Sequence, residues 1–298
     1  MRDPITNAYT PNEWETVPCP VCQSTVAVVY EKFGNELQYT YIQCKNCSLI
    51  YSSPRPKYNQ DFIDCCYSSY YQYAENLSAQ DLESVKESSL ILFEKELNHL
   101  LLFDKKRTAV LDIGSGMGTF LLAAKKHYKK LTSLDVSHQM AAFVEKAIGV
   151  KVLIKQFDEY EPDEKFSLIH MSHVIEHVPN PNEWIQHAGK HLEDDGILVI
   201  NVPNKLGLSY RLQHLFYKLR LKKQFSSSWN DATRTPDHLY EPTVKSFRYL
   251  IEKNGFKILD HYSYSRKDPA SNNNFFSKLM NRNFFTGSNL AFITQKNN

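Results

Sequence analysis

The chain has 298 residues, a formal net charge of +2 and 23% charged side chains. This length can bury a sizeable core and favours one large domain with a small appendage over two equal domains. The near-neutral charge argues against wholesale nucleic-acid binding, although it is compatible with a local basic patch. The start, MRDPITN, has no apolar signal region, and no uncharged apolar run approaches the roughly 18 residues of a membrane span. We therefore expect a cytoplasmic protein.

Two Cys-x-x-Cys pairs stand near the N-terminus and consist of Cys19, Cys22, Cys44 and Cys47. Each pair can place two thiolates on one tight turn, and two such turns joined by a hairpin give tetrahedral zinc coordination. The stretch between the pairs is rich in β-branched and aromatic residues and is broken near Gly34-Asn35, as a hairpin would be. We expect a structural zinc site in a small unit over residues 1–56. The alternative is four free thiols in the same small β-unit.

Residues 57–103 connect this unit to the rest of the chain. Pro54 and Pro56 predict an extended exit from the small unit, and Arg55 between them is interpreted as a surface charge rather than an anion contact. The tyrosine-rich stretch that follows either walls a substrate cleft or forms a packing seam. Residues 81–103 carry apolar side chains at helical spacing, which predicts a helix leading into the main domain.

The segment AVLDIGSGMGTF, residues 109–120, has glycines at 114, 116 and 118 after a short apolar strand. Three glycines in five residues remove every Cβ where the backbone turns sharply and approaches a ligand. The simpler interpretation is a tight strand-to-helix connection. A dinucleotide site usually has the spacing Gly-x-Gly-x-x-Gly, and Asp112 before the first glycine would repel a pyrophosphate but suits a cationic ligand. Asp135 ends the next apolar stretch and supplies a second carboxylate.

From residue 109 onward, short apolar runs alternate with helical patterns. This alternation predicts an α/β fold with a doubly wound, mostly parallel sheet and helices on both faces. Ligands in such folds bind outside the carboxyl ends of the strands. A later helix over 243–254 should stop at Gly255, and residues 261–287 are interpreted as a polar tail before a last strand. The expected strands are 109–113, 131–136, 151–155, 166–171, 196–202 and 289–295; the helices between them are 117–129, 138–148 and 181–192, the last with Asn180 as its N-cap and Pro181 at its first position.

The segments VLDIGSGMG and LTSLDVS resemble the first two motifs of the class I S-adenosylmethionine (SAM)-dependent methyltransferases. The resemblance implies a Rossmann-like, seven-stranded methyltransferase sheet over residues 104–298, with a helical insert at 205–240. In that family the glycine loop lies beneath the amino-acid part of the cofactor, and the acid ending the second strand accepts both ribose hydroxyls. These roles fall on Asp112, Gly114, Gly116 and Gly118 for the loop, and on Asp135 for the ribose.

The resemblance extends to the adenine end of the cofactor. In the family, an acid and an apolar residue after the third strand receive the adenine amino group and pack on the ring, and Gln156 and Phe157 stand there. The glutamine departs from the commoner acid, yet its carbonyl oxygen can accept the amino hydrogen. Ser115 and Ser172 complete the predicted cofactor-binding set.

After the fourth strand stands the segment SHVIEHVPNP, which contains His173, Glu176 and His177. Its His-x-x-Glu-His pattern matches an inverted zinc-peptidase signature, but a preceding strand and Pro179 exclude the uninterrupted helix that such a site needs. The segment resembles the family motif that faces the sulfonium and the methyl acceptor. Three interpretations stay open: His173 or His177 is a general base, the three side chains hold a divalent ion that orients an acceptor hydroxyl, or Glu176 and His177 only pin the loop.

Two later segments bear on the acceptor. His238, in a His-Leu-Tyr that resembles the family's region before the sixth strand, is the third candidate base, with loop pinning as the alternative. Residues 205–225 form a basic amphipathic pattern. We interpret this pattern as a lid or core-covering helix, with peripheral membrane contact as the alternative.

The segment CKNCSLIYSSPRP resembles the end of a zinc-ribbon appendage in one bacterial subset of these methyltransferases. Members of this build act on sugars or other small metabolites. We therefore predict SAM-dependent methylation of an oxygen or nitrogen on a small, carbohydrate-like acceptor, with a structural zinc ion. The rival functions are RNA methylation, with the ribbon and the basic helix gripping phosphates, and a binding protein that keeps SAM without turnover.

Overall fold

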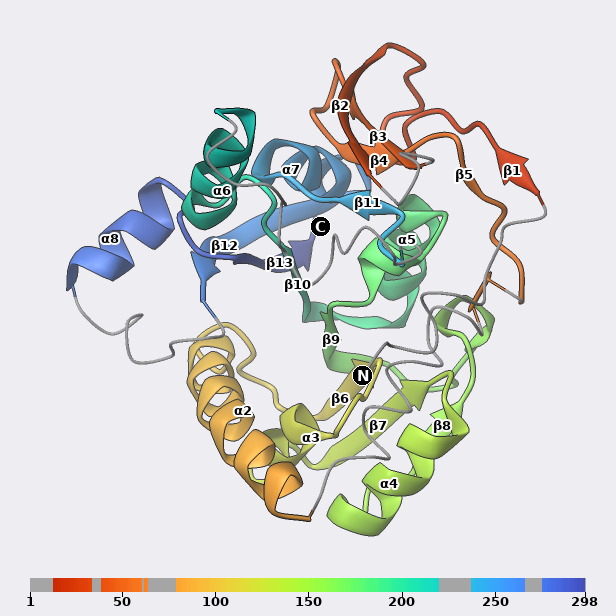
Figure 1. The fold of residues 1–298 in the computed structure, drawn as a ribbon. Coiled ribbons are helices and arrows are strands. Elements are labelled where there is room, and N and C mark those ends of the chain that lie inside the picture. Colours follow the sequence, from red (N-terminus) through yellow and green to blue (C-terminus); the bar gives the residue numbers. More distant parts are fainter. Residues whose placement is uncertain are drawn as a thin grey trace.

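A computed structural model describes residues 13–33, 39–60, 62–63, 79–219, 237–265 and 275–297. The main sheet in this part consists of β6 (Ala109–Ile113), β7 (Lys130–Asp135), β8 (Val152–Ile154), β9 (Phe166–Ser172), β10 (Leu192–Pro203), β12 (Phe256–Tyr264) and β13 (Asn289–Lys296). Their order across the sheet is β12-β13-β10-β9-β6-β7-β8 (Figure 1). The strands from β10 to β8 are parallel, and β13 runs against both of its neighbours. The predicted α/β fold class is confirmed.

Helices cover both faces of this sheet because its strands bury side chains on both. Val110 and Leu168 pack with α2 (Ala79–Leu100) and α3 (Thr119–Ala124). The next residues along, Leu111 and Ile169, pack on the other face with α5 (Pro181–His191) and α7 (Val244–Lys253). The helix α4 (His138–Ile148) closes the edge at β8. Strands buried on both faces are continuous apolar runs in the sequence, and for this reason they could be predicted from it.

Helix ends follow local sequence signals. The helix α5 has Asn180 at its N-cap and Pro181 at its first position, as predicted, although the Asn180 side chain bonds to Glu183 rather than to the backbone. Thr243 begins α7 with a capping box. The predicted helix 117–129 is shorter than expected, because Gly118 has a left-handed backbone at its N-cap and the helix ends at Ala124.

The predicted polar tail over 261–287 is wrong. The strand β12 continues to Tyr264, and α8 (Phe275–Asn283) precedes β13. The strand β12 lacks a continuous apolar run in the sequence, because it is an edge strand and is half-exposed along most of its length. Asp260 on this strand binds Arg282 of α8 with an Nη1–Oδ1 distance of 2.8 Å.

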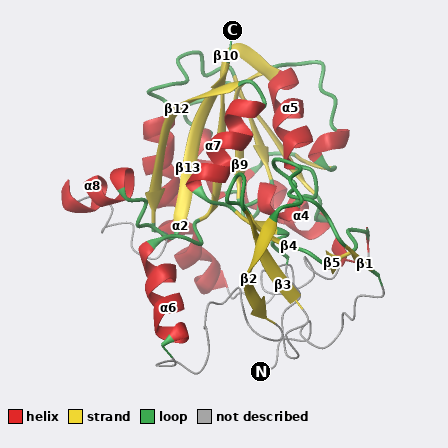
Figure 2. Ribbon diagram, turned by 90° about the horizontal axis from the view of Figure 1, so that it is seen from above, coloured by secondary structure: helices red, strands yellow, loops and turns green. Residues whose placement is uncertain are grey.

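The N-terminal segment forms a second, smaller sheet from β2 (Ala27–Phe33), β3 (Tyr39–Cys44) and β4 (Ile50–Ser52). A distant strand, β11 (Tyr240–Glu241), extends this sheet by pairing antiparallel with β4. In Figure 2 the small sheet and α6 (Leu208–Lys218) lie at the end of the main sheet away from the C-terminus. This end is the carboxyl edge of the parallel strands, because β13 runs antiparallel and finishes at the opposite edge.

The small sheet is fastened to the main domain by side chains. Asn182 of α5 donates to the carbonyl oxygens of Pro20 and Val21 at 2.8 and 3.2 Å, and Lys253 of α7 donates to Val21. Arg55 lies in β5 (Arg55–Pro56), which pairs with β1 (Trp14–Glu15). Its side chain is buried and its Nε lies 2.7 Å from a Glu15 oxygen. The interpretation of Arg55 as a surface charge is therefore wrong.

Two predicted regions lie largely outside the described residues: the tyrosine cluster around Tyr67–Tyr73 and the second part of the insert, 220–236. The first part of the insert is α6. Along and just beyond it, the side chains of Leu208, Leu212, Leu215, Phe216 and Leu219 are exposed. Among the described helices, none is long and apolar enough to cross a membrane.

Replacing Gly118 with alanine is expected to destabilise the fold more than the same change at Gly149. Both glycines have nearly the same left-handed backbone, φ 71° and 72°, so the conformational cost of about 1–2 kcal/mol is shared. A Cβ at Gly118 would also lie 2.4 Å from Ile148 Cδ1, whereas nothing lies within 4 Å at Gly149. Crowding should cost Gly118→Ala a further 1–3 kcal/mol, roughly. Urea unfolding measures the difference, and equal losses would contradict it.

Candidate functional site

The glycine loop lies where the chain reverses its direction across the sheet, between β6 and β9. All three glycines have positive φ, 74° at Gly114, 48° at Gly116 and 71° at Gly118. A Cβ at Gly114 would lie 2.5 Å from a methyl group of Val174, in the loop after β9. The two loops therefore touch, and they do so at the topological switch point where doubly wound folds bind ligands.

Asp135, at the end of β7, holds the glycine loop. Its Oδ2 accepts hydrogen bonds from Ser115 Oγ at 3.1 Å and from the Gly116 amide at 3.2 Å. Its Oδ1 accepts from the Ser137 amide at 2.9 Å. Burial raises the pKa of Asp135 more than these hydrogen bonds lower it. The predicted ribose-binding acid and the predicted glycine loop are thus one hydrogen-bonded unit.

Asp112 belongs to a buried charge network that sequence reasoning missed. It lies beside His170 in the β6–β9 register, and its Oδ1 is 2.7 Å from His170 Nδ1. Glu96 of α2 approaches the other ring nitrogen at 3.8 Å, and Asn201 donates to the same Glu96 oxygen at 2.6 Å. Burial lowers the pKa of His170, but the two carboxylates outweigh it and raise the pKa to about 9. The network therefore fixes the strand end that carries the glycine loop.

The predicted adenine residues occupy different environments. Gln156 is half-buried and precedes a short 3-10 helix, Phe157–Glu159. The Phe157 ring is 1% exposed and packs edge-on against Trp184 and His187 of α5. Ser172 is half-buried at the end of β9. Val136, directly after Asp135, is 41% exposed and was not predicted, although an apolar side chain beside a ribose-binding acid can pack on a base.

The structure brings three of the predicted catalytic residues together at the carboxyl end of β9. Glu176, His177 and His238 each offer a ligand atom, and these atoms all lie within 4.8 Å of one another. Glu176 is fully buried, and its Oε1 is 3.2 Å from Nδ1 of His173, the fourth predicted residue. Within the described residues, Glu176 Oε2 has no hydrogen-bond partner. His173 has a left-handed backbone, φ 58°, an unusual conformation for a histidine.

The histidines differ in protonation. His177 Nδ1 donates to the Asp237 carbonyl oxygen at 2.8 Å, so Nε2 is the basic nitrogen of the neutral ring. Burial and the neighbouring His238 lower the pKa of His177 below its ordinary value of 6.5. Burial also disfavours the charge on His238, but Glu241, Asp237 and Glu176 outweigh it and raise its pKa to about 9. At neutral pH His177 is a neutral ring and His238 is a cation.

The small sheet contributes to this cluster. Tyr41 of β3 donates its hydroxyl to the His238 carbonyl oxygen at 3.0 Å, and Leu239 donates its amide to the Glu176 carbonyl oxygen at 2.9 Å. Glu241 lies between His238 and Lys205, 3.3 Å from each, and the two cations hold the pKa of Glu241 at about 2 despite its burial. Sequence reasoning missed this link because it depends on the pairing of β4 with β11.

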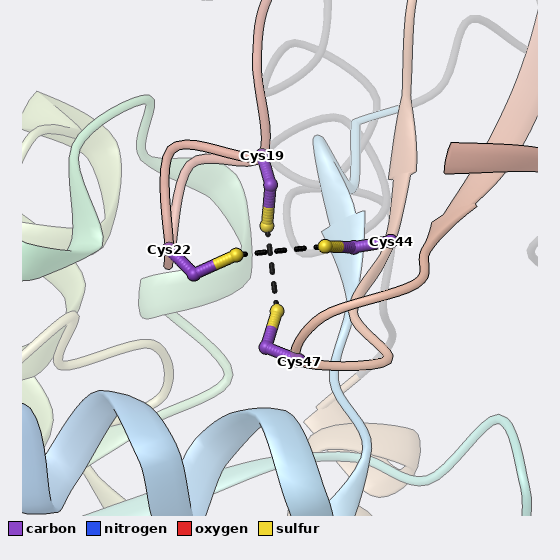
Figure 3. A group of neighbouring side chains, drawn as sticks. All are labelled: Cys19, Cys22, Cys44 and Cys47. Atoms are coloured by element: carbon purple, nitrogen blue, oxygen red, sulfur yellow. Dashed lines mark hydrogen bonds between the residues drawn. The ribbon is translucent and has the colours of Figure 1, made fainter. Parts of the chain in front are cut away.

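The four cysteines meet at the other end of the small sheet. Figure 3 shows their sulfur atoms pointing toward one centre from two loops. The Sγ–Sγ distances are 3.4 Å for Cys19–Cys47 and 3.5 Å for Cys22–Cys44. Tetrahedral Zn²⁺ with bonds of about 2.3 Å separates its sulfurs by about 3.8 Å, so a small outward shift would admit the ion. Four thiols in this arrangement fit a structural metal ion.

The strand order, the glycine loop and the acid at the end of β7 together define a SAM-dependent methyltransferase of class I, with a four-cysteine unit added at the N-terminus. The family described as "Methyltransferase domain" matches residues 90–261, more than half of the chain. The chain belongs to this family. The predicted fold and enzyme class are thereby confirmed.

Curated relatives are distant and match in part. A 104-residue segment is 30% identical to (S)-coclaurine N-methyltransferase of Papaver somniferum and covers 32% of this chain and 30% of that protein. A 131-residue segment is 32% identical to the ubiquinone biosynthesis O-methyltransferase of Glaesserella parasuis. It covers 37% of this chain and 50% of that protein. The chain thus spans half or less of the length of these relatives.

Solved structures share the fold. The 1,6-didemethyltoxoflavin-N1-methyltransferase of Burkholderia thailandensis aligns over 90% of this chain and 100% of its own, with a TM-score of 0.53 and 13% identity. A SAM-dependent methyltransferase of Thermotoga maritima aligns over 76% of this chain and 97% of its own, with a TM-score of 0.53 and 17% identity. At these identities the likeness concerns the fold alone.

Proposed function

We propose that this protein transfers the methyl group of SAM to a hydroxyl oxygen of a small, carbohydrate-like metabolite. The observation that carries the proposal is the group of Glu176, His177 and His238, of which the first two stand in the loop that touches the glycine loop. A hydroxyl is weakly acidic and needs a base, whereas an amine only has to be neutral. A neutral histidine whose Nδ1 carries the proton, and whose Nε2 is therefore basic, suits a hydroxyl acceptor.

The cofactor is proposed to occupy the loop formed by Gly114, Ser115, Gly116 and Gly118. When bound, SAM supplies a methyl group activated by its sulfonium. Asp135 would accept the ribose hydroxyls. Three of its roughly four lone-pair positions are already filled by its own loop, so the Ser115 hydroxyl would turn away. Gln156 and Val136 border the proposed adenine position, while Phe157 supports it from the core.

At the acceptor, we assign His177 as the general base. Its Nε2 would take the hydroxyl proton as the oxygen attacks the methyl carbon, and the Asp237 carbonyl would stabilise the ring that becomes charged. The buried Glu176 carboxylate holds His173 in place, with its Oε1 3.2 Å from His173 Nδ1. His238 and Lys205 supply positive charge on the side of the small sheet. Several donors and acceptors gathered in one group suit a polyhydroxylated ligand.

The four cysteines are proposed to hold a structural Zn²⁺ ion. Its role is to fix the small unit, residues 1–56 as predicted, so that Tyr41 and β4 keep the segment 238–241 in place. The ion would lie away from the acceptor group and take no part in the transfer.

The experiment that tests this function is a screen for SAM-dependent mass gain with nucleotide sugars, free sugars, small amines and RNA. The proposal expects a gain of one methyl on a sugar hydroxyl. His177→Gln should lower kcat by about 10²–10⁴-fold, since a positioned base contributes that much. SAM affinity and thermal stability should stay close to those of the wild type. The exposed His127→Gln is the control. Methylation of RNA only, or SAM binding with no acceptor methylated, would refute the proposal.

The rate should depend on pH in a bell shape. Transfer requires neutral His177, so kcat rises as this ring deprotonates, with a midpoint below 6.5. Transfer also relies on charged His238, so kcat falls as this ring loses its proton at a pH of about 9. In His177→Gln the acid limb should disappear while the alkaline limb stays. An acid limb that persists unchanged in His177→Gln, or a wild-type rate that does not fall as the pH rises through about 9, would contradict the assignment.

A further inference from the structure

A second group of metal-ligating side chains lies outside the site described above. His187 and His191 are one helical turn apart on α5, and Glu161 follows the short helix Phe157–Glu159. The two histidine side chains are 8% and 9% exposed, with ring centroids 4.6 Å apart, whereas the Glu161 side chain is 68% exposed. Two histidines at this spacing project from one face of a helix, as in known zinc sites.

The geometry of this group suits an ion. The Nε2 of His191 lies 3.3 Å from Glu161 Oε2, and the Nδ1 of His187 lies 3.9 Å from Glu161 Oε1. One ligand atom from each of the three residues lies within 4.8 Å of the others. Ligands on a tetrahedral zinc ion are about 3.3 Å apart when the bonds are about 2.0 Å, so small side-chain movements would close the site.

Each of the two rings has a nitrogen near Glu161 that is not taken up by another hydrogen bond in the described residues. His187 donates its Nε2–H to the Tyr160 carbonyl oxygen at 2.9 Å, which leaves the Nδ1 lone pair on the side of Glu161. A backbone acceptor on the remote nitrogen is typical of metal-ligating histidines. The Nε2 of His191 is buried and, in the described part of the chain, makes no hydrogen bond. A buried imidazole nitrogen 3.3 Å from a carboxylate oxygen can share a metal ion with it.

We propose that Glu161, His187 and His191 form a second metal site, which binds a divalent transition-metal ion such as Zn²⁺, with water in the remaining position. Two imidazoles and one carboxylate suit Zn²⁺, Co²⁺ or Ni²⁺, whereas Mg²⁺ and Ca²⁺ prefer oxygen ligands. The exposed carboxylate gives the ion a path from solvent.

The site would connect the metal to the region of the predicted adenine residues. The Phe157 ring lies 4.8 Å from the His187 ring and 5.4 Å from that of Trp184, measured between centroids. An ion that joins Glu161 to α5 would restrain the segment 157–161 from both of its ends. Metal occupancy should therefore raise the melting temperature of the protein, independently of any methyl transfer.

The test is a Co²⁺ titration of the full-length chain whose four cysteines already hold one equivalent of Zn²⁺. The wild type should bind a second equivalent with d–d absorption bands and without the intense thiolate-to-metal bands of a cysteine site. Glu161→Gln should weaken this binding at least about 10-fold and His191→Asn about 100-fold. Glu159→Gln, an exposed acid in the same segment, is the matched control and should bind like the wild type.

Three results would overturn the proposal: no second equivalent in the wild type, unchanged affinity in Glu161→Gln and His191→Asn, or equal weakening in Glu159→Gln. The Glu161 side chain is largely exposed, so its substitution should leave the fold intact. Weaker metal binding in this variant can then be assigned to the lost ligand. The outcome concerns metal binding alone and does not depend on the proposed methyl acceptor.

Discussion

Asp135→Ala should lower the affinity for SAM by more than about 100-fold, because the variant loses the two charge-assisted hydrogen bonds that we propose Asp135 makes to the ribose, each worth about 1.5–3 kcal/mol. The change also releases Ser115 and Gly116, whose hydrogen bonds to the same carboxylate shape the glycine loop. The loop would then have to be ordered at the expense of binding energy. Calorimetric titration of SAM into wild type and variant measures the effect.

Ser115→Ala is the matched control for this prediction. It removes one hydrogen bond of the loop but leaves both oxygens of Asp135 for the ribose, so SAM affinity should fall by less than about 5-fold. Asp135→Asn keeps the shape of the side chain, and its SAM affinity should lie between those of Asp135→Ala and Ser115→Ala. This variant separates a loss of hydrogen bonds from a loss caused by misfolding. Affinity in folded Asp135→Ala within about threefold of the wild type would show that the cofactor does not use this acid.

Cys44→Ser should prevent the four-cysteine site from holding the proposed Zn²⁺ ion and abolish methyl transfer while SAM still binds. Cys44 ends β3 and is buried, so the serine leaves three thiolates and an incomplete coordination shell. Structural zinc sites contribute about 10–16 kcal/mol to folding, and loss of even part of this should disorder the small sheet. Because β4 pairs with β11, His238 and Glu241 would lose their support. The glycine loop is held by β7 and should be unaffected.

Metal analysis and SAM calorimetry on the same samples test this prediction. Cys65→Ser is the control, since the sequence places Cys65 outside both Cys-x-x-Cys pairs. Cys44→Ser should hold about one equivalent of zinc less than the control, because only the cysteine site is lost. Zinc content equal in the two variants would exclude the cysteine cluster as the metal site. Full methyl transfer without zinc would exclude its proposed role in supporting the acceptor group.

The sequence predicted the central strands and the glycine loop because their signals are local. Strands buried on both faces are continuous apolar runs, and Gly114 and Gly118 mark backbone that other residues would strain. The Asn180-Pro181 helix start and the end of α7 at Gly255 follow the same kind of short-range rule. The Cys-x-x-Cys spacing likewise predicted that the four thiols would meet.

The acceptor side could not be predicted because its contacts join residues far apart in the chain. The bond from Tyr41 to the His238 carbonyl spans 197 positions, and β11 is only two residues long. Periodicity cannot detect so short a strand. His170 stood within an apolar run, and only the β6–β9 register shows that it faces Asp112. For the same reason, the sequence offered three histidines as bases without separating neutral His177 from charged His238.

The most direct test of the central claim is a crystal structure of the protein with S-adenosylhomocysteine. The account predicts that the nucleoside lies over the loop from Gly114 to Gly118, that both ribose hydroxyls contact the Asp135 carboxylate, and that the sulfur faces His177. A cofactor product bound elsewhere, or a ribose that does not contact Asp135, would contradict it.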